Sequence, residues 1–291
     1  MVEAVGPDKL DVPESMPLAR GSDPSCIQVR RLWLEGCSVN NRVARVIGEH
    51  MRNLTSLNLA DTEVASEGVQ ALAPLVRLRV LNLSGCKLTN AALGTIGSHF
   101  PQLLELHLDC PTVSDAGLAL LRPLAPHLQR LDLFEAHVSD AGLEHLSGFV
   151  RLVALECCCG RITNKGVGAV GRHLPALTSL NLSHNAAIDD QGLEPLRGLR
   201  KLVHLNLSGT KVTHKGLAIL TSSTSSGGSG SPGNAATAGA TSAQQPSGSV
   251  CVAPLQRISL FGCDVKATSG KLAQLPPGLQ LGIDAGVLVV E

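Results

Sequence analysis

The stretch Leu54-Thr-Ser-Leu57-Asn-Leu59 decides the fold, because the chain repeats it. A close copy, Leu-Leu-Glu-Leu-His-Leu, begins at Leu103, and the same six residues as at Leu54 return at Leu177. The same frame starts, in steps of 24 or 25 residues, at Val29, Leu54, Leu78, Leu103, Leu128, Leu152, Leu177 and Leu202, and it returns at Leu255. A fixed period of this length indicates stacked copies of one small structural unit.

The second half of each repeat predicts a short helix. A further apolar residue follows each strand, at Val39, Val64, Leu88, Val113, Val138, Ile162, Ile188, Val212 and Val265. The next residue can cap a helix, because its side-chain oxygen can accept a hydrogen bond from a free helix N–H, at Asn40, Thr89, Ser114, Ser139, Thr163, Asp189 and Thr213. Glycine stands four places after the apolar residue at Gly68, Gly117, Gly142, Gly166, Gly192 and Gly216.

Each unit is therefore a strand, a turn and a helix whose single apolar stripe is buried only by stacking on its neighbours. We predict an α/β solenoid shaped like a horseshoe, with a parallel sheet on the concave face and short helices on the convex face. The expected segments are an irregular lead-in at 1–26, repeats one to eight at 27–220, a disordered Ser/Gly/Ala-rich insertion at 221–252, and repeat nine with a C-terminal cap at 253–291.

Composition limits the classes of partner. Hydrophobic residues make up 44% of the 291 residues and aromatic residues only 2%, which suits a regular stack of small units. Lys plus Arg and Asp plus Glu are balanced at 24 each, so no overall field would draw the protein to nucleic acid or to an anionic membrane. No apolar run approaches the roughly 18–20 residues of a transmembrane helix. We therefore expect neither nucleic-acid binding nor membrane insertion.

Three consecutive cysteines, Cys157, Cys158 and Cys159, raise the question of a metal or redox centre. In the frame of repeat six, Cys157 takes a core leucine position, Cys158 points to the open face and Cys159 begins the turn. Adjacent residues on opposite faces cannot easily chelate one ion, and the chain has no C-x-x-C pair or Cys/His array with zinc spacing. We expect small, mostly buried thiols in a reduced intracellular protein without metal or cofactor.

The pattern L-x-x-L-x-L-x-x-N/C-x-L is that of leucine-rich repeats, and three cysteines occupy its asparagine/cysteine position: Cys37, Cys86 and Cys263. With Ser-Asp-Ala-Gly-Leu at 114–118 and 139–143, and Thr-Asn-Lys-Gly-Val at 163–167, the chain resembles the cysteine-containing repeats of F-box proteins over 27–220 and 255–283. The resemblance implies a protein-binding solenoid, or alternatively substrate recognition for a cullin-type ubiquitin ligase. Because only residues 1–26 precede the first repeat, that alternative is expected to need a separate F-box subunit.

Residues that flank the inner leucines of each strand are predicted to face the concave surface. Ser and Asn are usual there, so the candidates for partner binding are the residues that differ: Arg31, Trp33, Glu105, His107, Asp109, Arg130, Asp132, Phe134, Glu156, Arg257 and Phe261. Neighbouring strands lie about 4.8 Å apart, so four acids should form one patch beside Phe134: Glu105, Asp109, Asp132 and Glu156. A partner with a basic segment and an apolar anchor would fit; the alternative is a merely solvated face.

His107 and Asp132 face each other across adjacent predicted strands, which raises a catalytic alternative. A nucleophile must lie within hydrogen-bond reach of its base, yet the open-face thiol of Cys158 lies two strands from His107, roughly 10 Å away. Phosphate-binding glycine loops and H-E-x-x-H are absent. We therefore predict a monomeric protein-binding module that is not an enzyme, located in the cytoplasm, with the nucleus or a cilium as alternatives.

Overall fold

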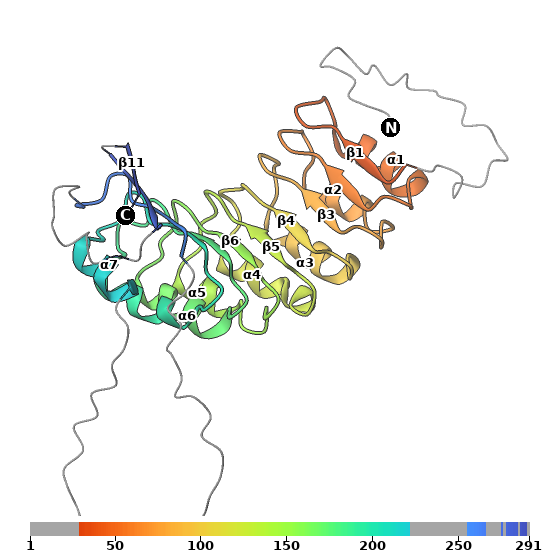
Figure 1. The fold of residues 1–291 in the computed structure, drawn as a ribbon. Helices are drawn as coiled ribbons and strands as arrows, with labels where there is room; N and C mark the ends of the chain where they lie inside the picture. The colour runs from red at the N-terminus through yellow and green to blue at the C-terminus, as the bar shows by residue number, and fades with distance from the viewer. Residues whose placement is uncertain (1–28, 222–254, 266–274, 276–277, 285, 290–291) are drawn as a thin grey trace, which may run out of the picture.

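A computed structural model describes residues 29–221, 255–265, 275, 278–284 and 286–289. The strands lie side by side in chain order in one sheet, and the helices line the opposite side of the solenoid (Figure 1). Strands β1 to β10 are parallel, and β11 pairs antiparallel with β10. The predicted α/β solenoid is confirmed. The predicted lead-in at 1–26 and all but the first residue of the predicted insertion at 221–252 lie outside the described residues.

The strands are three or four residues long. They are β1 Arg31–Trp33, β2 Ser56–Asn58, β3 Val80–Asn82, β4 Glu105–His107, β5 Arg130–Asp132, β6 Ala154–Glu156, β7 Ser179–Asn181, β8 His204–Asn206, β9 Arg257–Ser259, β10 Gln280–Ile283 and β11 Gly286–Val289. Equivalent residues pair in register, as Leu57 with Leu81 and Leu81 with Leu106. Corresponding side chains of successive repeats therefore form straight rows across the sheet.

The helices are short too, with three to ten residues each. The α-helices are α1 Asn41–His50, α2 Ser66–Ala71, α3 Asn90–His99, α4 Asp115–Leu120, α5 Asp140–Glu144, α6 Asn164–His173 and α7 His214–Thr221, and the 3₁₀ helices are η2 Arg122–Leu124 and η3 Asp190–Gly198. Helix η3 contains Pro195, which lacks the N–H that an α-helical hydrogen bond requires. Repeat seven therefore has a 3₁₀ segment where its neighbours have an α-helix.

The core lies between the sheet and the helices. The frame leucines are fully buried at 0% exposure in Leu54, Leu78, Leu103, Leu128, Leu152, Leu177 and Leu202. All nine apolar residues predicted to follow the strands are also buried, and Phe100 and Phe149 fill the space beside them. Each fully buried leucine contributes about 1.5–3 kcal/mol relative to exposure. The repeated apolar pattern is thus the main source of stability.

Five of the seven predicted helix caps are confirmed. The side chains of Asn40, Ser139, Thr163 and Asp189 accept hydrogen bonds from helix N–H groups, and Thr213 Oγ1 accepts one from Lys215 N at 3.2 Å. For Thr89 and Ser114 the prediction is wrong. Their hydroxyls turn to the preceding repeat, where Thr89 pairs with the Ser66 hydroxyl at 3.0 Å and Ser114 accepts from Asn90 Nδ2 at 2.9 Å.

A second polar contact joins each repeat to the next, and we call the series the inter-repeat ladder. The side chain of the first helical residue accepts a hydrogen bond from the backbone N–H of the residue that precedes the next helix. The acceptor–donor pairs are Asn41–Ala65 (2.8 Å), Ser66–Thr89 (3.0 Å), Asn90–Ser114 (3.1 Å), Asp115–Ser139 (2.8 Å), Asp140–Thr163 (2.8 Å), Asn164–Asp189 (3.1 Å) and Asp190–Thr213 (2.7 Å). Every junction from repeat one to repeat eight has this bond.

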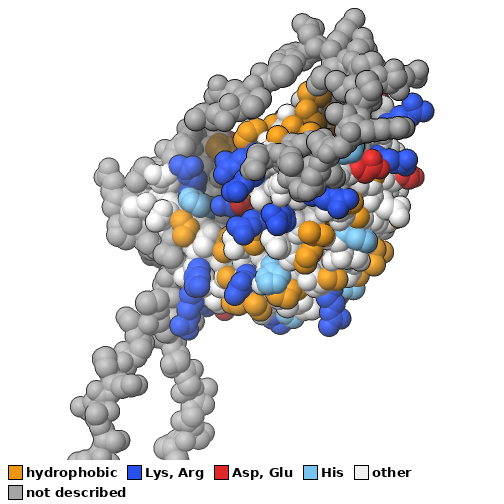
Figure 2. All heavy atoms as spheres, turned by 90° about the vertical axis from the view of Figure 1, so that its right-hand side faces the viewer, with side chains coloured by type: hydrophobic (Ala, Val, Ile, Leu, Met, Phe, Trp, Pro, Cys, Tyr) orange, Lys and Arg blue, Asp and Glu red, His pale blue; other side chains and the backbone are white. Residues whose placement is uncertain are grey.

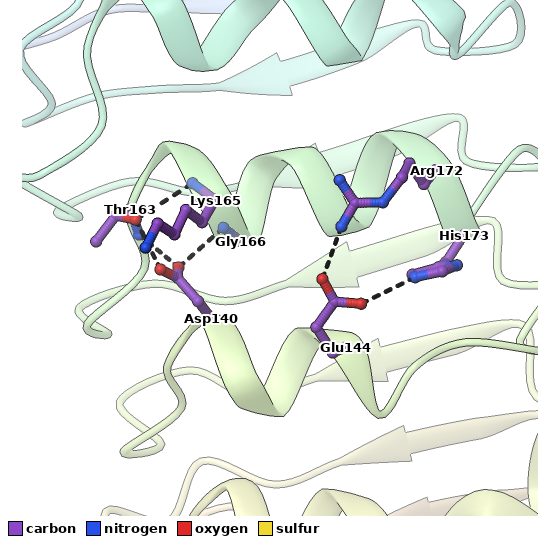
Figure 3. Close-up of polar contacts among 7 residues, drawn as sticks. All are labelled: Asp140, Glu144, Thr163, Lys165, Gly166, Arg172 and His173. Atoms are coloured by element: carbon purple, nitrogen blue, oxygen red, sulfur yellow. Dashed lines mark hydrogen bonds and ion pairs between the residues drawn. The ribbon is translucent and has the colours of Figure 1, made fainter.

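The ladder explains why glycine stands four places after the apolar residue that follows each strand. Figure 3 shows Asp140 between Thr163 and Gly166: its Oδ1 accepts from Thr163 N at 2.8 Å and from Gly166 N at 2.9 Å. A Cβ atom at Gly192 would stand 2.5 Å from Oδ1 of Asn164. Glycine is therefore required here by the close approach of the ladder side chain, since these helical glycines do not have positive φ angles.

Replacing Asp140 by alanine should destabilise the fold, because it leaves the N–H groups of Thr163 and Gly166 and the Thr163 hydroxyl without their acceptor. We expect a loss of about 1–3 kcal/mol in the free energy of unfolding, measured by urea denaturation. Asp140→Asn is the matched control, because asparagine fills the same place at Asn90. It should lose less than half as much. Equal losses in the two variants would contradict the hydrogen-bond explanation.

Candidate partner-binding face

The side of the sheet turned away from the helices, here called the open face, carries three rows of side chains. Register places one row along the first residues of the strands and a second along the third residues, for example Trp33, Asn58 and Asn82. The third row consists of the residues two places after each strand, among them Asp109 and Phe134. All eleven predicted partner-binding residues lie in these rows; their role remains a prediction.

The usual asparagines of the second row have a structural task. The Oδ1 atoms of Asn58, Asn82, Asn181 and Asn206 accept hydrogen bonds from the backbone N–H two residues later, at 2.9 to 3.2 Å. Asp132 makes the same contact with Phe134 N at 3.0 Å. These contacts close the turn that follows the strand. Asp132 therefore has two roles, because its other oxygen faces a neighbouring strand.

That neighbour is His107. Its Nδ1 lies 3.4 Å from Oδ2 of Asp132, as predicted from the strand pairing. The hydrogen bond to Asp132 raises the pKa of His107; burial opposes this, and the negative charges of Glu105 and Glu156 reinforce it. Glu105 itself forms an ion pair with Arg130 across the same two strands, with Nε and Oε1 3.4 Å apart.

Negative charge gathers further along the third row. Burial raises the pKa of Asp109, and the nearby carboxylates of Glu135, Asp132 and Asp61 raise it further. Asp61 and Glu135 were not predicted from the sequence as part of this cluster. They occupy a turn position with positive φ, 54° in both, where repeat three has Gly85. We define the acidic patch as Asp61, Glu105, Asp109, Asp132, Glu135 and Glu156.

The chain's five aromatic residues divide sharply between core and open face. Trp33 is 60% exposed, Phe261 46% and Phe134 36%, whereas Phe100 and Phe149 are fully buried. The predicted exposure of the first three is confirmed. Phe261 lies against Gly282 of β10, where a Cβ atom would meet its ring at 3.0 Å. Trp33, the most exposed of the three, is therefore the most available anchor for a partner.

The predicted exposure of Cys158 is wrong. Its thiol hydrogen-bonds with Ser183 in the next repeat, and the residue is only 1% exposed. Burial raises its pKa to about 11, so the thiol is neutral at pH 7 and supplies no nucleophile to the His107–Asp132 pair. Cys157 is buried in its leucine position as predicted, and Cys159 stands exposed in the turn with φ at 57°.

In the part of the chain that the structure describes, no group of three or more His, Cys, Asp or Glu residues is arranged to hold a metal ion. Within the same residues, no helix has the length and apolar character needed to cross a bilayer.

A cavity beside the sheet was not predicted from the sequence. It lies beside β1 to β4, where the strands begin, and Arg30, Arg77 and Arg79 line it together with Asn53, Thr55 and Gln102. The available signal was an arginine immediately before the first open-face residue in repeats one and three, Arg30 and Arg79. These residues precede the strands, so a search limited to the open-face rows passes over them.

Comparison with known proteins identifies the class. Family models described as leucine-rich repeats match residues 50–73, 125–147 and 173–196, and residues 77–103. The crystal structure of internalin C2 from Listeria monocytogenes is similar with a TM-score of 0.51 and 22% identity, over 63% of this chain and 73% of that one. No curated protein gave a match.

The chain thus contains leucine-rich repeats and folds as a leucine-rich-repeat solenoid. Such repeats typically act as scaffolds for protein–protein interaction. The likeness to internalin C2 bears on the fold alone. Membership of the cysteine-containing subclass of F-box proteins remains a prediction from the sequence.

The His107 pKa offers a direct test of the geometry. It should lie above the ordinary value of 6.5 and fall in Asp132→Asn, which retains the turn contact to Phe134 N but removes the negative charge. Because the folded-state pKa is raised, the pair contributes stability below pH 6.5 and loses it as the pH rises through the folded value. Titration of the imidazole by NMR measures both pKa values. An unchanged pKa in the variant would contradict the assigned contact.

The three adjacent cysteines should differ in reactivity. At pH 7.5 iodoacetamide should alkylate Cys159 well before Cys157 or Cys158, because burial holds both of these thiols neutral and shielded. Fragment ions in mass spectrometry locate the modified residue. Cys159→Ser should abolish rapid alkylation of the peptide that carries the three cysteines, and rapid alkylation of Cys158 would show that its burial is wrong.

Proposed function

We propose that this protein is a non-catalytic interaction module that holds a partner protein on its open face, at the acidic patch and Phe134. One observation carries the proposal most directly: among the described residues, the six carboxylates of the acidic patch have only Arg130 and His107 as ion-pair partners. Burial and the neighbouring carboxylates raise the pKa of Asp109. A fixed group of carboxylates that repel one another is stabilised by an incoming positive charge. The partner accordingly presents a segment with Lys or Arg.

The patch is only partly neutralised by its own repeats. Arg130 pairs with Glu105 and His107 faces Asp132, which leaves the charges of Asp61, Asp109, Glu135 and Glu156 for a ligand. Of these, Glu156 accepts one hydrogen bond from Asn181 Nδ2 at 3.3 Å. The exposed ring of Phe134 stands in the same row as Asp109, so an apolar side chain beside the basic segment completes the recognition.

The framework favours binding at low entropic cost. The patch is carried by in-register strands and by turns closed through hydrogen bonds such as Asp132 to Phe134 N. Side chains held on a rigid surface lose little freedom when a partner arrives. This supports a preformed site, in which the repeats hold the charges close together before binding.

The test replaces Phe134 and two residues of the acidic patch by the residues that the chain itself uses in the same rows. The changes are Asp109→Ser, Phe134→Ser and Glu156→Asn. Ser84, Ser183 and Asn181 occupy the equivalent places, so the fold should be retained. Affinity purification from the native cell, read by quantitative mass spectrometry, should show at least tenfold loss of a defined set of proteins. Asp132 is left unchanged because its loss would also open a turn.

The matched control carries Glu63→Gln and Val150→Ser, two exposed positions outside the open-face rows. It should retain the wild-type set of proteins. If the triple variant also retains that set, the acidic patch is solvated surface and the proposal fails.

The alternative function, substrate recognition for a cullin-type ubiquitin ligase through a separate F-box subunit, rests on the sequence resemblance alone. The same purification tests it: a cullin and its adaptor would have to appear in the retained set. Their absence would leave the plain scaffold as the supported function.

A further inference from the structure

A basic groove lies at the N-terminal end of the solenoid, and none of the acidic-patch residues lines it. Two adjoining cavities form it, of about 440 and 580 Å³, and they share Arg30, Thr55 and Arg79 in their walls. The first is completed by Asn53, Arg77 and Gln102, and the second by Arg31, Trp33, Ser56, Val80 and Leu104. Figure 2 faces this side of the molecule and shows Lys and Arg side chains gathered on it, with few Asp or Glu.

The positive charge of the groove is not balanced from within. None of the residues that line it is acidic, and Arg30, Arg31, Arg77 and Arg79 form no ion pair within the described part of the chain. Arg77 has one neutral contact, from Nη1 to Asn53 Oδ1 at 3.1 Å. By contrast, three arginines elsewhere are paired with glutamates: Arg130, Arg172 and Arg197. The four exposed guanidinium groups of the groove can therefore bind an anion.

The spacing of the arginines is fixed by the backbone. Thr55 N donates to Arg30 O at 2.8 Å, and Arg79 N donates to Thr55 O at 2.8 Å. Arg30 and Arg79 thus stand two strand spacings apart, which is about 10 Å. Arg31 accompanies the first and Arg77 the second, so the groove presents two pairs of arginines. A peptide in the extended polyproline II conformation advances about 3.1 Å per residue with three residues per turn, so residues three apart lie on the same side of it, about 9 Å apart, close to this separation.

Trp33 supplies an apolar contact in the same groove. It is 60% exposed at the third residue of β1 and lines the larger cavity beside Arg31. Tryptophan and arginine are the side chains most enriched at the centres of protein interfaces. The chain as a whole has no net charge and no long-range field to gather a nucleic acid. The combination therefore favours a short peptide over a polyanion.

We propose that the basic groove binds an extended acidic segment of a partner protein, with two carboxylate side chains three residues apart and an apolar residue packed on Trp33. One carboxylate lies between Arg30 and Arg31 and the other between Arg77 and Arg79, each through charge-assisted hydrogen bonds. This goes beyond the proposed function, because it concerns other residues and the opposite charge.

The probe is a set of fluorescein-labelled decapeptides of Gly and Ser that each carry one Phe and two Glu residues, with the second Glu one to five positions after the first. Fluorescence polarisation with the full chain should give the tightest binding for the spacing of three. The variant Arg30→Gln with Arg79→Gln should bind that peptide at least tenfold more weakly. Glutamine is the residue that this chain has at the same place in Gln129 and Gln256, so the substitution suits the fold.

The control variant is Arg122→Gln with Arg151→Gln, two exposed arginines of later repeats that do not line the groove. It should bind within twofold of the wild type. Absence of binding to every peptide, affinity independent of the spacing, or an equal loss in the control would each overturn the proposal. Tighter binding of a single-stranded oligonucleotide of the same charge, lost in the Arg30 and Arg79 variant, would overturn the assignment to a peptide.

Discussion

The hydrogen bond from the first helical residue of one repeat to the backbone of the next is the contact on which the arrangement depends. Burial of leucines drives the repeats together, but it is non-directional and would tolerate sliding. The ladder acceptors, such as Asn41, Asp140 and Asp190, fix one repeat against the next with a single geometry. The neighbouring glycine, as at Gly216, is what lets the acceptor approach so closely. Directional polar contacts therefore convert a hydrophobic stack into an aligned one.

Alignment gives the open face its chemical character. Since strands pair in register, a substitution in one repeat lies beside the equivalent residue of the next, and like charges accumulate into surfaces that no single repeat could form. The acidic patch and the basic groove arise in this way on a chain whose total charge is zero. Positive and negative side chains are thus gathered in different places on the surface, although their charges sum to zero.

The sequence was sufficient for the fold and for the open-face rows, because both follow from the period and from alternation along the strands. Trp33 and Phe134 could be placed outside the core by position alone. The sequence was not sufficient for Cys158, which is buried and hydrogen-bonds with Ser183 of the next repeat. Nor did it reveal Asp61 and Glu135, because their contribution depends on a left-handed turn. The missing information was three-dimensional proximity between repeats.

The same register joins β8 to β9, because Leu205 pairs with Ile258 although more than fifty residues separate them in the sequence. The distance between two strands of the solenoid therefore depends on the number of repeats between them and not on the number of residues. Each strand that separates two surface residues adds about 4.8 Å to the distance between them. Duplication or loss of one internal repeat would shift every surface residue on one side of it by that step relative to those on the other side. The number of repeats between two surface residues therefore sets the length of a partner that can contact both.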